Sequence, residues 1–274
     1  MKIIKEKQVM IDGLRISYCE NIEEKPEKIT LFLHGWGSNK ESFTLLFPLR
    51  KNIIALDFPA FGKSVGLTKA FNLNNYAVFL EKFIEKIVRD NSQNSKKINI
   101  EFIVHSFGGR VLLKYLENKN MKNNNSENIN ITNIICMGVP FYRNLTKIQK
   151  IQINFSKFLH KNKYTNSIKN IITPVFNFLF QNKNSDYNTL DGEVMKKTFQ
   201  NIVNEDISVY IKNLNKYTNN SANLKLIWGE NDEAAPLYYA KNVHKKYSAS
   251  ELCIVVNAGH FPWVDNFEEV KKVF

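Results

Sequence analysis

Short apolar runs alternate with longer amphipathic segments along most of the chain. The runs are rich in Ile, Leu, Val and Phe, as expected of strands that are buried on both faces of a sheet. Between them, apolar positions recur with the period of an α-helix. This alternation predicts an α/β fold in which helices flank a mostly parallel central sheet. The predicted strands cover residues 29–33, 52–56, 98–104, 131–137, 224–228 and 252–256.

The segments around these runs carry further signals. Residues 8–19 turn at Asp12 and Gly13, which predicts an entering β-hairpin. Residues 76–88 place their apolar side chains on one face and predict an amphipathic helix. The Lys- and Asn-rich residues 118–130 predict a surface loop between a helix and the next strand.

A last helix is predicted over residues 266–274. Asn266 and Glu269 stand three residues apart, which is the spacing of a capping box. In that motif each of the two side chains satisfies a backbone N–H group of the first helical turn. We therefore expect the helix to open at these residues.

One stretch interrupts the alternation of strands and helices. From residue 143 to residue 223 the chain shows helix-like periodicity and no convincing strand. Because this stretch lies between two predicted core strands, we interpret it as a helical insertion above the sheet. The expected organisation is a core of residues 1–142 and 224–274, with residues 143–223 as a helical cap.

The charge of the chain is compatible with several classes of partner. The net charge is +12 and the pI is near 9.4, as in proteins that bind nucleic acid, anionic membranes or acidic ligands. The excess is almost all Lys, which accompanies Asn and Ile throughout, so a lysine-rich background composition explains it equally well. No motif typical of DNA or RNA binding accompanies the charge, and we expect no nucleic-acid partner.

The cysteines and the apolar runs bear on the cellular compartment. Cys19, Cys136 and Cys253 are far apart and odd in number, so they form neither a disulfide framework nor a metal-spaced cluster. The first residues lack the apolar stretch of a signal peptide. No apolar run approaches the roughly 20 residues of a membrane helix. We therefore expect a cytoplasmic protein without an integral membrane segment or a bound metal.

A serine stands where a predicted strand passes directly into a helix. Residues 102–110 read FIVHSFGGR, with Ser106 followed by Phe107 and two glycines. Such a turn holds the hydroxyl clear of the backbone, and the amide that follows lies at a helix N-terminus, where negative charge is stabilised. A serine before glycines is also common as a simple helix cap. The segment resembles the nucleophile turn of the α/β-hydrolase family, although Val104 stands where the family usually has Gly.

Four further segments resemble the same family, each after a predicted strand. Residues 34–38 (HGWGS) are similar to its HGxG loop. Residues 57–64 (DFPAFGKS) are similar to its D-x-P-G-x-G-x-S turn, with Ala60 in place of the first Gly. Residues 228–236 (WGENDEAAP) and 257–263 (NAGHFPW) are similar to its G-x-x-D-x-x-x-P and G-H segments. The resemblance covers nearly the whole chain outside the insertion.

The resemblance implies a catalytic triad of Ser106, Asp232 and His260, which stand in the family's chain order. Ser106 is then the nucleophile, and His260 is the general base that a hydroxyl needs near neutral pH. Asp232 orients and stabilises the imidazolium. Glu230 and Glu233 lie close by, but the spacing of the motif favours Asp232.

The resemblance also implies an oxyanion hole. Its donors are the backbone N–H groups of Trp36 and Phe107, and such a donor typically contributes about 3 kcal/mol. His34 is expected to be structural, and the turn of residues 57–64 is expected to mark the fold without taking part in catalysis.

These residues imply acyl transfer by a serine hydrolase that acts on a carboxylic ester or a similar acyl compound through an acyl-enzyme. The mechanism needs no metal and no organic cofactor. One alternative is a carbon–carbon bond hydrolase or a menaquinone-type lyase, toward which Arg110 beside the nucleophile turn is a hint. The alternative from another class is a ligand receptor or signalling protein with slow hydrolysis.

Selection of the substrate is expected to depend on the insertion. The expected partner is a small acyl substrate with an apolar portion, and the sequence does not indicate an oligomeric state. An anionic acyl group is an alternative, because residues 143–223 contain 12 Lys and Arg against 5 Asp and Glu. Apolar side chains of the insertion that could line a pocket are Phe155, Phe158, Val175, Phe176, Phe178, Leu179 and Phe180.

Overall fold

The six apolar runs predicted as strands all lie in one sheet of the computed structural model, together with the two strands of the predicted hairpin. The structure describes residues 4–24, 26–91, 97–121, 129–142, 192–211, 214 and 223–274. The strands are β1 (Lys5–Ile11), β2 (Leu14–Asn21), β3 (Lys28–Leu33), β4 (Ile53–Leu56), β5 (Ile98–His105), β6 (Ile129–Met137), β7 (Asn223–Gly229) and β8 (Glu251–Val255).

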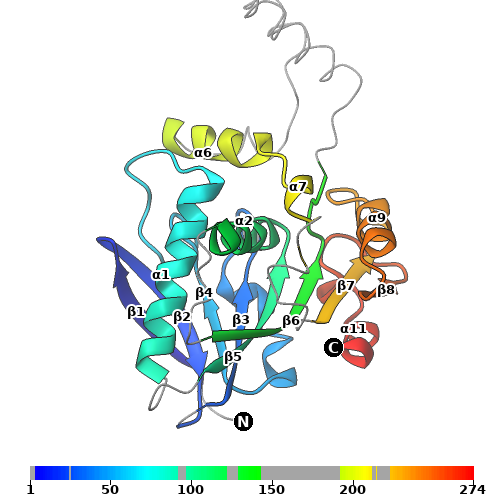
Figure 1. Ribbon diagram of the computed structural model, residues 1–274, viewed down its shortest axis with the longest axis horizontal. Coiled ribbons are helices and arrows are strands. Elements are labelled where there is room, and N and C mark those ends of the chain that lie inside the picture. Colours follow the sequence, from blue (N-terminus) through cyan, green and yellow to red (C-terminus); the bar gives the residue numbers. More distant parts are fainter. Residues whose placement is uncertain are drawn as a thin grey trace, which may run out of the picture.

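The sheet is mostly parallel, as predicted, with the strand order β1-β2-β4-β3-β5-β6-β7-β8 (Figure 1). Strands β3 to β8 run parallel, whereas β1 and β2 form an antiparallel hairpin that joins the sheet at β4. At the hairpin turn Asp12 and Gly13 have φ values of 48° and 78°. Two successive positive φ angles are what a two-residue hairpin turn requires, so the predicted turn is confirmed.

The chain changes direction across the sheet between β3 and β5, which are neighbours at its centre. From β3 the chain passes to β4 on one side, and from β5 it passes to β6 on the other. The segments that leave the carboxyl ends of β3 and β5 therefore diverge. In open α/β sheets, ligands bind in the crevice formed at such a point. The HGWGS segment and the Ser106 turn follow these two strands.

Each face of the sheet is covered by its own apolar core. One face packs against helices α1 (Leu73–Asn91), α2 (Phe107–Met121) and α9 (Tyr238–Lys246). The other packs against the 3-10 turns η1 (Lys40–Phe43) and η2 (Phe47–Leu49) and helices α10 (Pro262–Asp265) and α11 (Phe267–Val273). The apolar face predicted for α1 is buried along its whole length. Across the described residues, no helix combines the length and apolar character needed to cross a membrane.

Helix α2 is longer than predicted. We expected a loop from residue 118, but the helix continues to Met121. Asn118 donates a hydrogen bond to the side chain of Asn74 on α1 at 2.9 Å, a tertiary contact that the polar composition of the segment does not reveal. Residues 122–128 of the predicted loop lie outside the described residues, and β6 begins at Ile129.

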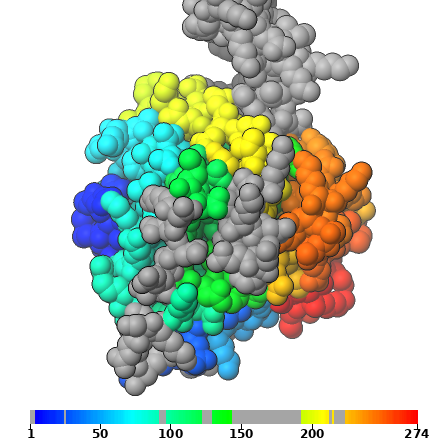
Figure 2. Space-filling model, viewed as in Figure 1, coloured from blue at the N-terminus to red at the C-terminus, as the bar shows by residue number. Residues whose placement is uncertain are grey.

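The described part of the predicted cap is helical. It contains α6 (Glu193–Asn204) and α7 (Ser208–Ile211), and α6 lies across the top of the sheet in Figure 1. In Figure 2 this yellow segment rests against α1 and α2. Phe71 anchors α6 through two hydrogen bonds of 3.0 Å, one to Thr198 Oγ1 and one from Asn201 Nδ2. Residues 143–191, with the predicted apolar lining, lie outside the described residues.

Half of the predicted capping box is present at the last helix. The Asn266 side chain accepts a hydrogen bond from the backbone N–H of Glu269 at 3.4 Å. The Glu269 carboxylate pairs instead with Lys272, and the Asn266 N–H donates to the carbonyl of Pro262. The single cap is enough to begin α11 at the residue that follows Asn266.

A buried ion pair joins two loops beside the carboxyl ends of β3 and β4. Lys40 is 1% exposed and Asp57 is fully buried. Lys40 Nζ lies 2.7 Å from Asp57 Oδ2, and its backbone N–H donates to Oδ1 at 2.7 Å. The backbone N–H of Lys63 donates to the same carboxylate at 2.9 Å. The Asp57 carboxylate thereby fixes the segment after β3 to the turn after β4.

Replacement of Lys40 is expected to destabilise the fold strongly. Lys40→Met retains the apolar stem but leaves Asp57 buried without its cation, which typically costs about 3–5 kcal/mol. Urea unfolding measures this change. Lys82→Met is the matched control, because Lys82 and its partner Asp12 are largely exposed and the change there should be small. Equal stability of the two variants would contradict a structural role for the buried pair.

Candidate active site

Ser106 occupies a strained turn between β5 and α2. The strand ends at His105 and the helix begins at Phe107, so one residue makes the whole connection. Ser106 has a φ of 47°, in the left-handed region that residues with a Cβ rarely adopt. Its backbone N–H donates to the carbonyl of Met137 on the adjacent strand at 3.0 Å. Strain of this kind persists only where surrounding contacts enforce it.

Two glycines allow α2 to begin so close to the sheet. A Cβ on Gly108 would lie 2.2 Å from the carbonyl oxygen of Leu33, which belongs to the backbone of β3. A Cβ on Gly109 would lie 2.4 Å from Cγ2 of Val139. Neither position can hold a side chain, so the Ser-Phe-Gly-Gly order follows from the approach of the helix to the strands.

His260 and Asp232, which are 28 residues apart in the sequence, are in contact. His260 Nδ1 lies 2.9 Å from Asp232 Oδ2 and 3.0 Å from Oδ1. The Asp232 carboxylate is buried, and Oδ1 also accepts the N–H of Ala235 at 2.8 Å. Glu230 and Glu233 are exposed. Of the three neighbouring acids, it is therefore Asp232 that faces the imidazole.

Gly138, which belongs to none of the sequence motifs, lies beside this pair. It follows β6 and has a φ of 55°. A Cβ there would lie 2.9 Å from both Cε1 and Nδ1 of His260 and 3.2 Å from Asp232 Oδ2. Its neighbour Met137 accepts the N–H of Ser106. The sequence did contain one signal for this role: a glycine immediately after a buried strand permits another side chain to approach the backbone closely.

Ser106 follows β5 and His260 follows β8, with β6 and β7 between these two strands in the sheet. The two residues are not hydrogen-bonded to each other. Among the described residues, His260 is hydrogen-bonded to Asp232 through its ring and to His105 through its carbonyl. Catalytic hydrogen bonds are often loose without a substrate and tighten when one binds. The structure therefore brings together the base and acid of the predicted triad and places the serine beside them.

The predicted oxyanion donors come from two segments that follow neighbouring strands, β3 and β5. Trp36 follows β3 and Phe107 begins α2, and their rings are 5.4 Å apart. Within the described residues, neither backbone N–H donates to a backbone carbonyl. A Cβ on Gly35 would lie 3.4 Å from Cβ of Ser106, so the loop after β3 passes directly beside the serine.

His34 is buried within the scaffold. Its Nε2 accepts the N–H of Phe58 at 3.0 Å, so the proton is on Nδ1, which donates to the carbonyl of Gly35 at 2.7 Å. Burial is the main cause that lowers the pKa of His34 to about 4. The ring is therefore neutral at physiological pH, and it connects the loop after β3 to the turn after β4.

Aromatic side chains crowd around the predicted oxyanion loop. The Trp36 ring lies 4.9 Å from that of Phe61 and 5.2 Å from that of Phe199, which belongs to α6. Phe107 lies 5.2 Å from Phe58. These contacts pack Phe199 of α6 against the loop after β3 and give the surroundings of the serine turn an apolar character.

Arg110 has a structural environment. Its side chain is buried, and its two terminal nitrogens donate to the carbonyls of Pro140, Ile202 and Glu205 at 3.0, 2.8 and 2.6 Å. These acceptors hold the segment after α6 against the core. The guanidinium is engaged with backbone carbonyls, so this environment does not support the hint that Arg110 is a charged group of a substrate pocket.

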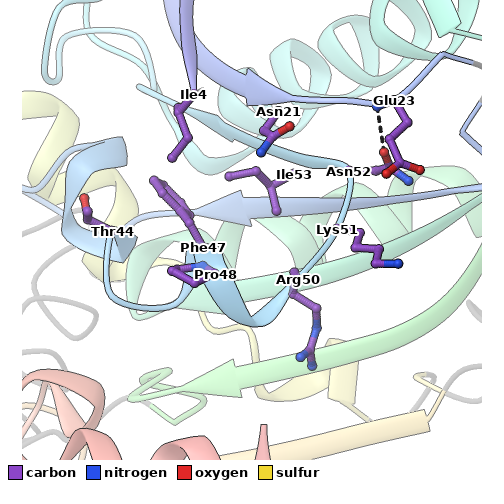
Figure 3. Close-up of a pocket in the computed structure, with 10 residues that line it drawn as sticks. All are labelled: Ile4, Asn21, Glu23, Thr44, Phe47, Pro48, Arg50, Lys51, Asn52 and Ile53. Carbon is purple, nitrogen blue, oxygen red and sulfur yellow. Dashed lines mark hydrogen bonds between the residues drawn. The ribbon is translucent and has the colours of Figure 1, made fainter. Parts of the chain in front are cut away.

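A separate cavity of about 570 Å³ opens at the opposite ends of the parallel strands. It lies at the amino end of β4, whereas Ser106 follows the carboxyl end of the parallel strand β5. Figure 3 shows Ile4, Phe47 and Ile53 facing one another across it. None of the predicted site residues lines this cavity.

No group of three or more His, Cys, Asp or Glu side chains that could hold a metal ion occurs within the described residues. His260 and Asp232 are engaged with each other. The donor set beside Ser106 is thus a base and an acid joined by hydrogen bonds, an arrangement suited to proton transfer.

Comparison with known proteins agrees with this architecture. Residues 30–267 match the sequence profile of a family described as alpha/beta hydrolase fold. No curated protein sequence matches the chain. Among solved structures, similar folds are found in a bromoperoxidase from Bacillus anthracis (15% identity, 98% of both chains, TM-score 0.67) and an esterase from Exiguobacterium antarcticum (16% identity, 96% of this chain and 95% of that chain, TM-score 0.64). A third is an N-acyl homoserine lactone degrading enzyme (14% identity, 97% of this chain and 98% of that chain, TM-score 0.63).

A methyl group at Gly108 is expected to disrupt the serine turn. Gly108→Ala would force Cβ against a backbone carbonyl, and the overpacking should cost about 3 kcal/mol or more. Gly66→Ala is the matched control, because the methyl group that it adds would have no neighbour within 4 Å and the φ of Gly66 is not positive. Urea unfolding compares the two. A Gly108 variant as stable as the Gly66 variant would contradict the close approach of α2 to β3.

The low pKa of His34 predicts acid sensitivity. The unfolded chain binds a proton near pH 6.5, whereas the folded chain binds it only near pH 4. The free energy of unfolding should therefore decrease as the pH falls from 6.5 to 4, by about 3 kcal/mol from this residue alone. His34→Gln retains a donor and an acceptor but no titration, so its stability should vary less with pH over this range. Denaturant unfolding at several pH values measures both slopes, and parallel slopes would refute the assignment.

Proposed function

Because the chain belongs to the α/β hydrolase fold family, we propose that it is a serine hydrolase that cleaves a carboxylic ester or a similar acyl compound. The observation that carries the proposal is the contact of His260 with the buried Asp232, beside a serine held at a φ of 47°. Ser106 is the nucleophile, His260 the general base and Asp232 the acid that orients it.

The hydrogen bonds of His260 support one direction of proton transfer. Asp232 can only accept when ionised, so His260 Nδ1 carries the proton that faces it and Nε2 is the free base. Nε2 takes the proton of the Ser106 hydroxyl as Oγ attacks the acyl carbon. The same proton then passes to the leaving alcohol as the ester bond breaks, and an acyl-enzyme remains. Water activated by His260 releases the acid and restores the serine.

The oxyanion is proposed to bind to the amides of Trp36 and Phe107. The Phe107 N–H lies at the amino end of the 15-residue helix α2, where the helix dipole favours negative charge. Two contacts fix the loop that carries Trp36 to the turn after β4: the hydrogen bonds of the His34 ring and the ion pair of Lys40 with Asp57. Donors that are fixed before the reaction stabilise the transition state without further reorganisation.

The substrate is proposed to be a small acyl compound with an apolar portion, covered by residues 143–223 as a cap. The support is the cluster of aromatic side chains around the serine turn, in which Phe199 of α6 packs on Trp36. The esterase from Exiguobacterium antarcticum has a similar fold. No described residue favours the carbon–carbon hydrolase or lyase alternative once Arg110 is engaged with backbone carbonyls.

Removal of any member of the triad is expected to abolish turnover of p-nitrophenyl esters of varied acyl length. Ser106→Ala, His260→Gln and Asp232→Asn should each lower kcat by about 10³-fold or more, because nucleophile, base and correct tautomer are lost respectively. A fluorophosphonate probe should label wild type at Ser106. Glu230→Gln and Glu233→Gln, exposed acids that flank Asp232, are the matched controls and should remain active.

The outcomes separate the functions. Wild type that neither turns over an ester nor reacts with the probe overturns the serine-hydrolase proposal. Labelling without ester turnover favours a carbon–carbon hydrolase or a slow receptor-type protein instead. Loss of activity in Glu230→Gln or Glu233→Gln comparable to that in Asp232→Asn would contradict the assignment of the acid.

A further inference from the structure

The histidine that precedes the serine is buried, and the mechanism above does not use it. His105 is the last residue of β5 and is 1% exposed. A buried polar side chain normally has hydrogen-bond partners for its polar atoms, so a ring nitrogen without one needs an explanation. His105 Nδ1 has no hydrogen-bond partner among the described residues.

The other ring nitrogen holds the backbone of the general base. His105 Nε2 lies 3.0 Å from the carbonyl oxygen of His260. A carbonyl only accepts, so Nε2 carries the proton and Nδ1 is bare. The ring thereby donates one hydrogen bond from the serine turn to the loop that presents the imidazole.

The bare nitrogen faces the loop after β3. The position that a Cβ of Gly35 would occupy lies 2.7 Å from His105 Nδ1 and 3.1 Å from Cε1. The loop can pass only because residue 35 has no side chain, and a hydrogen on its Cα points toward the nitrogen. His105 is therefore in contact with the segment that carries the Trp36 amide.

Aromatic rings fix the plane of His105. Its centroid lies 4.6 Å from that of His260, 4.7 Å from that of Phe261 and 4.9 Å from that of Trp263. The Trp263 Nε1 in turn donates to the carbonyl of Ser42 at 2.9 Å. The ring is thus held on one side by the base loop and on the other by the loop after β3.

We propose that His105 is a positioning residue that sets the loop of His260 and the loop of Trp36 at fixed distances from Ser106, through its hydrogen bond to the His260 carbonyl and its contact with Gly35. The proposal rests on the proposed function, because the distances matter for acyl transfer. A displacement of about 1 Å between such groups can lower a rate about 100-fold.

The charge state of the ring agrees with this role. Burial is the main cause that holds the pKa of His105 well below its usual value, and the proximity of His260 and His34 adds to it. The ring stays neutral, so it does not oppose the positive charge that His260 acquires when it takes the serine proton. A cation at this position would repel that imidazolium.

Two substitutions separate positioning from packing. His105→Gln keeps an N–H donor near the position of Nε2, whereas His105→Phe keeps the ring volume and loses the donor. We expect the Phe variant to lose about 10- to 100-fold in kcat with little change in KM, and the Gln variant to recover most of that loss. His244→Gln, on α9 and bonded to Ser250, is the matched control and should behave as wild type.

Gly35→Ala tests the second contact. Its Cβ would meet the His105 ring, so the variant should lose kcat in the wild-type background. In the His105→Ala background the ring is absent, and the added effect of Gly35→Ala should be smaller. Additive losses in this double-mutant cycle would overturn the contact between Gly35 and the His105 ring.

The melting temperature and fluorophosphonate labelling are measured for every variant. Similar melting temperatures for His105→Gln and His105→Phe, with the kcat of the Gln variant well above that of the Phe variant, support the proposal. Wild-type kcat in both variants, or equal losses of kcat that follow their losses of stability, overturn it while the triad stands. Absence of turnover and labelling in wild type overturns the proposed function and the role of His105 together.

Discussion

The site depends on the close approach of the amino end of α2 to the carboxyl end of β3. At Gly108 the helix backbone lies so near Leu33 that no Cβ fits, and the chain leaves β5 through a single residue with positive φ. This geometry lifts the Ser106 side chain out of the sheet and leaves the Phe107 N–H at the helix terminus. The loop after β3 lies beside the serine because β3 and β5 are neighbouring strands.

Strand order explains where the remaining groups come from. The chain diverges from β3 and β5 to opposite sides, and the crevice between them is where an open α/β sheet accommodates a ligand. Asp232 and His260 follow β7 and β8, which lie on the far side of β6 from β5. The loops that carry them therefore have to extend across the carboxyl end of β6. Gly138 makes that reach possible, because any side chain there would collide with the imidazole. The site is thus built from backbone at the carboxyl ends of five strands, β3, β5, β6, β7 and β8.

The three histidines near the serine share a residue type but differ in environment. His34 and His105 are fully buried, their pKa values are lowered mainly by burial, and each bonds to backbone. His260 is partly exposed and faces a carboxylate. Burial keeps the first two neutral and rigid, whereas the third has both a carboxylate partner and partial exposure. The exposure of each histidine and the group it contacts, rather than the residue type, distinguish the structural histidines from the proposed general base.

The sequence by itself determined the strands, the hairpin turn, the fold and the segments that carry Ser106, Asp232 and His260, because strand runs, helical periodicity and turn residues are local patterns. It could not reveal that Lys40 is buried on Asp57, that Arg110 binds backbone carbonyls, or that Gly138 and His105 lie against His260. Those contacts join residues on different strands and loops. Only the order and register of the strands decide which of them meet, and the tertiary structure alone supplies that information.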